Sequence, residues 1–433
     1  MTEAWIAHWT QGSDLSPGLI TLKWALLLAA AALAGHLVQR LLGLPKLVGY
    51  AVFGTLAGLT GLASADWPLR GAGLTLLELG IAVLLFEAGA RLSLRWLRHN
   101  PMVLAQSAVE SLLTYAAAYL LLRALGLELA VVRALSVVAV ASSPAVLLRA
   151  VSDLRASGPV TDRAIALATL NTLYALTLGT AMLRSIDRGD VTLLASLGAS
   201  AGVLGISLLV GGALAALLRL GFRLLHPASQ DTAIVILALI AACVALTTPL
   251  GGSAPLAALL AGIVLKQFHP RPWVWPRQLG TAASMLSIAM FVLVSSMAAQ
   301  AAWSGAMALA ALGLTGARLL AKLASLLLTG PVSALSLRQS AWVGVAMFPM
   351  SAVALLLTSQ FVAAAPTVGT SVTAIALPVI LLTELLGAAL VGLALVRAHE
   401  AAPPRRWREP PPAEVDAQET RPWRWKPSTP PRC

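Results

Sequence analysis

The sequence has few charged residues for its length. Only 11% of its 433 residues are Asp, Glu, Lys or Arg, whereas a soluble domain carries about 25%. Hydrophobic residues make up 58% of the chain and occur in long runs. This composition excludes an ordinary soluble protein and predicts an all-α protein that crosses a membrane many times.

Cysteine and clustered metal ligands are also scarce. Cys243 lies in an apolar run and Cys433 in a polar tail, so their positions predict neither a disulfide nor a metal site. No Ser/His or paired-Asp arrangement supports an intramembrane enzyme. The sequence therefore predicts a protein without metal, cofactor or enzymatic activity.

The basic residues are distributed as in a membrane protein. The formal net charge is +12, but the arginines lie in short loops between apolar runs. Basic loops, such as those with Arg95 and Arg155, alternate with neutral or balanced loops, which predicts an external N-terminus and a cytoplasmic C-terminus in the inner (plasma) membrane. The arginines are therefore expected to set the topology, and the protein is expected to have the lipid bilayer, and not nucleic acid, as a partner.

Hydropathy and loop charge together predict about thirteen membrane spans. Residues 1–19 are expected to form an extracytoplasmic segment and 20–396 the transmembrane domain. Residues 397–433, rich in Pro and Arg, are expected to be a disordered cytoplasmic tail. The predicted spans are 18–38, 46–63, 72–90, 101–122, 129–150, 162–183, 191–222, 231–248, 252–267, 279–299, 304–329, 338–359 and 371–396.

Two of these spans are interrupted by proline. Pro144 follows Ser142 and Ser143 in the fifth span, and Pro349 precedes Ser351 in the twelfth. Proline frees a backbone carbonyl, which a membrane tolerates only where the carbonyl is buried in protein or lines a wet cavity. Each proline alone could be a simple kink. Two breaks seven spans apart, and so inverted relative to each other, instead predict the solute site of a secondary transporter.

Polar and ionisable side chains within the spans are the candidates for function. Each charge in a span costs about 2.5–3.5 kcal/mol on insertion scales, so its presence indicates a role. Asn171 and Thr172 form a polar pair in the sixth span, and Glu87 could form a local ion pair with Arg91, four residues later. The ionisable candidates are Glu78, Glu87, Glu110, Arg318, Lys322 and Glu384.

Four segments in order resemble motifs of the monovalent cation:proton antiporters of the sodium/proton exchanger superfamily. They are LPKLVGYAVFGTLAGL at 44–59, LLELGIAVLLFEAGARLS at 76–93, GGSAPLAALLAGIVL at 251–265 and TELLG at 383–387. The resemblance implies two inverted repeats, about 20–185 and 231–396, joined by a linking helix at about 190–222. It also implies that the two broken helices cross near the midplane and that the protein forms a homodimer.

The resemblance also implies roles for individual residues. Lys322, in LLAKL, matches the lysine that the family carries on the helix before the second break. The family's ion-binding aspartate corresponds to Thr172, which cannot titrate and offers only a hydroxyl. Family members exchange H⁺ for Na⁺ or K⁺ because one carboxylate binds either ion.

We therefore expect a Na⁺ or K⁺:proton antiporter with an atypical ion site that lacks the usual carboxylate. The expected site residues are Asn171, Thr172, Lys322, Ser142, Ser143 and Ser351. One alternative is an anion or organic-acid transporter, since helix N-termini and a lysine without a carboxylate suit an anion. A second alternative is a membrane scaffold or sensor that does not transport.

Overall fold

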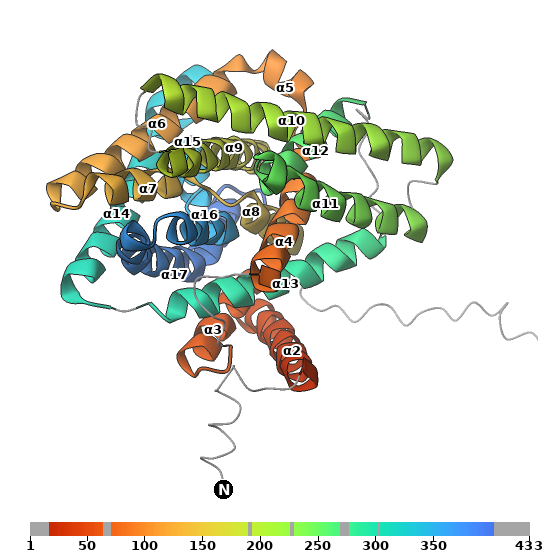
Figure 1. Ribbon diagram of the computed structural model, residues 1–433, viewed down its shortest axis with the longest axis horizontal. Helices are drawn as coiled ribbons and strands as arrows, with labels where there is room; N and C mark the ends of the chain where they lie inside the picture. Colours follow the sequence, from red (N-terminus) through yellow and green to blue (C-terminus); the bar gives the residue numbers. More distant parts are fainter. Residues whose placement is uncertain are drawn as a thin grey trace, which may run out of the picture. The chain divides into compact units, whose positions relative to one another are not determined.

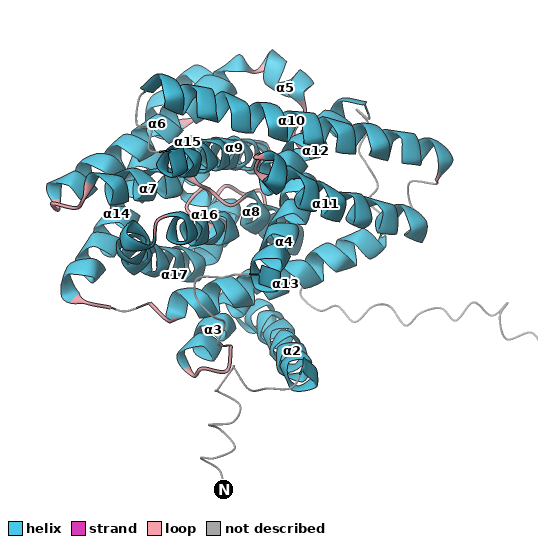
Figure 2. Cartoon of the chain, viewed as in Figure 1, coloured by secondary structure: helices cyan, strands magenta, loops and turns pink. Residues whose placement is uncertain are grey.

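The computed structural model describes residues 17–63, 71–188, 193–225, 229–268, 277–301 and 303–401. All secondary structure in these ranges is helical, with no strand (Figure 2), which confirms the predicted all-α fold. Eight of the helices are long and apolar enough to cross a membrane, and three shorter helices are also apolar. Most of the predicted N-terminal segment and of the predicted tail lies outside the described residues.

The helices match the predicted spans closely. α10 (Leu193–Leu224) lies in the chain where the linking helix is expected. The first half contains α2 (Pro17–Leu42), α3 (Lys46–Leu59), α4 (Gly71–Gly89), α5 (Leu94–His99), α6 (Pro101–Ala124), α7 (Leu129–Val140), α8 (Pro144–Leu154) and α9 (Pro159–Arg188). The second half contains α11 (Gln230–Leu250), α12 (Ala254–Phe268), α13 (Arg277–Ala299), α14 (Gly305–Thr329), the short 3₁₀ helix η1 (Pro331–Ser333), α15 (Leu337–Ala346), α16 (Ser351–Ala364) and α17 (Pro366–Arg397).

The two halves interlock through their broken helices. In the first half α7 and α8 form the broken helix, and α15 and α16 form it in the second. α15 and α16 pack against α9 of the first half, while α7 and α8 pack against α17, and α14 packs against α6. Figure 1 shows α8, α9, α15 and α16 in the middle of the view, with α10 and α2 toward opposite sides.

Both predicted helix breaks are confirmed, and they contact each other. Pro144 is the first residue of α8, where its missing amide leaves no hydrogen bond unmade. The Ser143 hydroxyl caps this helix by accepting from the Val146 amide at 3.3 Å, and the Ser143 amide donates to the Pro349 carbonyl at 2.9 Å. In Figure 2 these breaks are among the short loop segments at the centre of the molecule.

Close packing between α4 and α12 explains the glycines in two of the sequence motifs. A Cβ added to Gly89 would collide with the carbonyl oxygen of Leu259, and one added to Gly262 would collide with that of Phe86. Both glycines therefore allow the backbones of α4 and α12 to cross in direct contact.

The end of α17 is attached to the beginning of α9. The carboxylate of Glu400 accepts from the amides of Val160 and Thr161 and from the Thr161 hydroxyl, each at 2.7 Å. Side-chain oxygens commonly satisfy the free amides of a first helical turn in this way. Residues 397–401, which the sequence places in the tail, are thus held on the transmembrane domain.

Candidate functional site

The buried polar side chains of the two halves meet around the carboxylate of Glu110. Glu110 lies on α6 and its residue is 0% exposed, as is that of Lys322 on α14. Nζ of Lys322 lies 2.5 Å from Oε1 of Glu110. Thr114 donates its hydroxyl to the same oxygen at 3.1 Å, and Asn171 donates its amide to Oε2. The carboxylate therefore has one charged and two neutral donors, which compensate its removal from water.

A second layer of hydroxyls holds the side chain of Asn171. Ser107 and Ser111, both on α6, donate to Oδ1 of Asn171 at 3.3 and 3.0 Å. Because a carboxylate can only accept hydrogen bonds, the amide nitrogen of Asn171 faces Glu110, and its Oδ1 faces the two serines. Asn171 is thus held by α6 and in turn holds the carboxylate of Glu110.

Ser142, in the first break, connects Lys322 to both broken helices. Its hydroxyl accepts from Nζ of Lys322 at 2.9 Å and lies 3.2 Å from the Met347 carbonyl in the second break, to which it donates. Its own carbonyl lies 2.5 Å from the Thr172 hydroxyl, which is also 2.9 Å from the Ala168 carbonyl. A hydroxyl has one hydrogen, so Thr172 can donate to only one of these two carbonyls at a time.

Arg318 satisfies the carbonyls that the breaks leave free. It is fully buried on α14, one turn from Lys322. Its Nε donates to the Ala139 carbonyl at 2.7 Å, and its two terminal nitrogens donate to the carbonyls of Ala141 and Phe348. These carbonyls lie at the C-terminal ends of α7 and α15, the negative ends of the helix dipoles. The charge of Arg318 is therefore used in joining the breaks, which leaves Lys322 as the cation bound to Glu110.

The structure brings four of the six expected site residues into one hydrogen-bonded group: Asn171, Thr172, Ser142 and Lys322. Ser143 caps α8 instead, and the side chain of Ser351 lies outside the described part of the chain.

The other ionisable candidates lie in different surroundings. Glu87 pairs with Arg91 at 3.2 Å and with Arg149 at 3.4 Å, which includes the expected local ion pair. Glu78 is half-buried on α4 and hydrogen-bonds Gln360 of α16. Glu384 is buried on α17, and a part for it in the site stays a prediction.

The expectation that the site lacks a carboxylate is wrong, because Glu110 supplies one from a different helix. The sequence does contain a signal for this placement. Around Glu110, polar residues recur at spacings of three, four and seven, which puts them on one helix face. In a membrane such a face must turn inward, and its members are Gln106, Ser107, Glu110, Ser111 and Thr114, all buried.

Comparison with known proteins yields one family and one fold. Residues 26–396 match the family model described as sodium/hydrogen exchanger, transmembrane. No curated protein sequence matches the chain.

Two structures of the sodium proton antiporter MjNhaP1 from Methanocaldococcus jannaschii are similar to the chain. The structure at pH 8 has a TM-score of 0.66 and 16% identity, covering 86% of this chain and 97% of that one. The structure from an electron microscopy map has a TM-score of 0.67 and 15% identity, covering 90% of this chain and all of the other. At these identities the likeness shows a shared fold.

Proposed function

Because this chain belongs to the sodium/hydrogen exchanger family, we propose that it exchanges a monovalent cation, Na⁺ or K⁺, for a proton, and that the cation and the protonated Lys322 compete for the carboxylate of Glu110. The observation that supports this proposal is the fully buried ion pair of Glu110 and Lys322 beside the contacting helix breaks. Buried ionisable groups in membrane spans commonly mark an ion pathway. We place this multi-pass protein in the inner (plasma) membrane, with its C-terminus in the cytoplasm.

The proposed exchange is a substitution at the carboxylate. An entering cation takes the place of Nζ of Lys322 on Glu110, where the Thr114 and Ser142 hydroxyls can supply further oxygen ligands. Lys322 then has no counter-charge, and an unpaired buried charge costs several kcal/mol. Lys322 therefore releases its proton to the side from which the cation came. When the cation leaves, Lys322 takes up a proton and pairs with Glu110 again.

The charges in this cycle balance with one proton per cation. The site holds one negative and one positive charge before the exchange. Afterwards it holds the carboxylate, the bound cation and a neutral lysine. A titratable side chain at position 172 would add a second exchangeable charge, but Thr172 offers none. We therefore propose electroneutral exchange, which a membrane potential alone does not drive.

Within this site Asn171 positions the carboxylate and Thr172 organises the first break. The amide nitrogen of Asn171 faces Glu110, so it presents a donor, and not a ligand, toward a cation. The Thr172 hydroxyl interacts with the Ser142 carbonyl, which sets the position of Ser142 next to Lys322. Both side chains thus act on the cation through the groups that they hold.

Flux through reconstituted protein tests this proposal. Proteoliposomes with an acidic lumen and an internal pH dye would receive Na⁺, K⁺ or choline outside. We expect Na⁺ or K⁺, but not choline, to raise the internal pH with wild-type protein. Glu110→Gln should abolish the response. The matched control is Glu128→Gln, which makes the same change at an exposed position at the start of α7 and should respond like wild type.

The same assay decides between the proposal and its alternatives. The anion hypothesis was based on a site without a carboxylate, and Glu110 removes that basis. Flux that depends on the anion and not on the cation would nevertheless support the anion hypothesis. Folded protein without any cation or anion flux would favour the scaffold or sensor. Cation-dependent flux that persists in Glu110→Gln would show that a side chain other than Glu110 binds the exchanged cation.

A further inference from the structure

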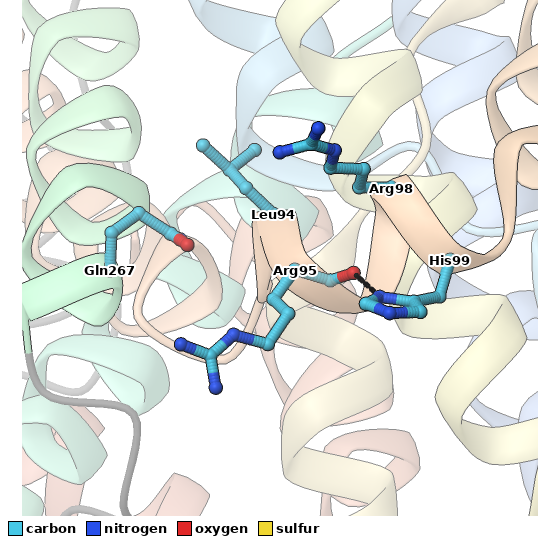
Figure 3. A pocket seen from close by; sticks show the side chains of 5 residues that line it. All are labelled: Leu94, Arg95, Arg98, His99 and Gln267. Atoms are coloured by element: carbon cyan, nitrogen blue, oxygen red, sulfur yellow. Dashed lines mark hydrogen bonds between the residues drawn. The ribbon is translucent and has the colours of Figure 1, made fainter.

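A cavity of about 640 Å³ lies between α5 and the end of α12, and no residue of the Glu110 site lines it. Its lining residues are Leu94, Arg95, Arg98 and His99 of α5 and Gln267 of α12. Figure 3 shows the side chains of Arg95 and Arg98 extending from α5 toward the side on which Gln267 lies. This volume is in the range of small-ligand sites, about 300–1,000 Å³.

The two arginines of this cavity have no acidic partner among the described residues. Three other arginines are engaged: Arg91 and Arg149 bind Glu87, and Arg163 donates to Gln106 and to the Ser333 carbonyl. Arg95 and Arg98, by contrast, are exposed and adjacent to the same cavity. Their mutual repulsion would be relieved by an anion bound between them.

The short helix α5 holds these side chains on a fixed base. Ser93 caps the helix, with its hydroxyl 3.4 Å from the Trp96 amide, and Leu97 is buried in the core. The Arg163 guanidinium lies 6.0 Å from the centre of the Trp96 ring, a cation–π distance. Because the backbone is already ordered, a ligand would have to immobilise only the arginine side chains, which lowers the cost of binding.

We propose that this cavity binds the phosphate group of an anionic ligand. Arginine guanidinium groups match phosphate oxygens with paired, charge-assisted hydrogen bonds. Nε2 of Gln267 donates to the Ile263 carbonyl at 2.9 Å, so its oxygen remains to accept from a hydroxyl on the ligand. Leu94 is 46% exposed and adds an apolar wall. The phosphate can belong to an anionic phospholipid headgroup or to a soluble phosphate compound.

Binding to the full-length, delipidated protein in detergent tests this site. The probes are dioctanoyl phosphatidylglycerol, dioctanoyl phosphatidylcholine and inorganic phosphate, the last against chloride at equal ionic strength. Thermal-shift titrations would give the affinities. We expect phosphatidylglycerol to bind better than phosphatidylcholine if the natural source is a lipid. Inorganic phosphate would bind as well if the source is soluble.

Substitution then locates the binding. Each lost charge-assisted hydrogen bond costs about tenfold in affinity. Arg95→Gln combined with Arg98→Gln removes one such bond from each arginine and should therefore weaken the affinity for the bound probe about a hundredfold. The control Arg223→Gln removes an exposed arginine near the end of α10 and should leave the affinity unchanged. If the double variant does not fold, Arg98→Gln alone replaces it and should still weaken binding about tenfold.

Three results would overturn the proposal. One is the absence of binding by all three probes. Another is equal affinity of the two lipids together with no binding of phosphate. The third is an affinity of the Arg95 and Arg98 variants equal to that of Arg223→Gln. None of these results bears on the Glu110 site, because the flux assay measures that site separately.

Discussion

Replacing Glu110 with glutamine removes the negative charge at the centre of the site and keeps its shape. The glutamine carbonyl can accept from Lys322 and Thr114, which both bind the same oxygen of the carboxylate. The glutamine amide would meet the amide nitrogen of Asn171, but Asn171 can rotate by half a turn. Its nitrogen would then donate to Ser107 and Ser111, whose hydroxyls accept as readily as they donate. The substitution therefore tests the effect of the negative charge of Glu110 while the geometry of the site stays nearly unchanged.

The expected loss of stability follows from the burial of the pair. Removing one partner of a buried ion pair costs about 3–5 kcal/mol. Glu110→Gln keeps the hydrogen bonds, so we expect the lower end of this range, about 3 kcal/mol. Glu110→Ala also leaves Thr114 and Asn171 without an acceptor and should lose about 1–3 kcal/mol more. Glu110→Gln combined with Lys322→Met removes both charges and should recover much of the loss, because a buried pair adds little net stability.

Denaturant unfolding in detergent micelles at neutral pH would measure these differences as free energies of unfolding. The expected order is wild type, then the double variant, then Glu110→Gln, then Glu110→Ala. A change within about 0.5 kcal/mol for Glu110→Gln, as for ordinary surface substitutions, would refute the reasoning. A double variant less stable than Glu110→Gln would also refute it, because Lys322 would then have a charged partner other than Glu110.

Three further predictions concern neighbouring residues. Lys322→Gln should abolish cation-dependent proton flux while the protein stays folded, which the proteoliposome assay would show; residual flux equal to wild type would mean that Lys322 carries no proton. Arg318→Leu should destabilise the protein by about 3 kcal/mol or more, since it leaves three buried carbonyls unsatisfied. In thermal unfolding, the melting temperature of Arg318→Lys should lie between those of wild type and Arg318→Leu. Thr172→Val removes the hydrogen bond to the Ser142 carbonyl and should lower the apparent cation affinity in flux titrations, whereas Thr172→Ser should restore it.

The fold was predictable from the sequence because its determinants are local. Hydropathy marks the helices, and Pro144 and Pro349 mark the breaks, since a proline restricts the backbone wherever it occurs. The polar pair Asn171 and Thr172 likewise stands out within an apolar run. Such features need no knowledge of which helices are neighbours.

The contact of Glu110 with Lys322 was not predictable in this way, because the two residues are 212 positions apart. Their pairing depends on α6 packing against α14, which the hydropathy of a single sequence does not show. The role of Arg318 depends on the same packing, because its acceptors come from both breaks. The polar face of α6 indicated an inward direction but did not identify the partner.

Proton release on cation binding tests the central claim most directly. Purified protein in a weakly buffered detergent solution would be mixed with NaCl, KCl or choline chloride, and the pH followed with a dye. If a cation displaces Lys322 from Glu110, Na⁺ or K⁺ should release about one proton per protein, because binding is coupled to deprotonation of the site. Glu110→Gln should release none. Cation binding without proton release in wild type, or equal release in Glu110→Gln, would contradict the account.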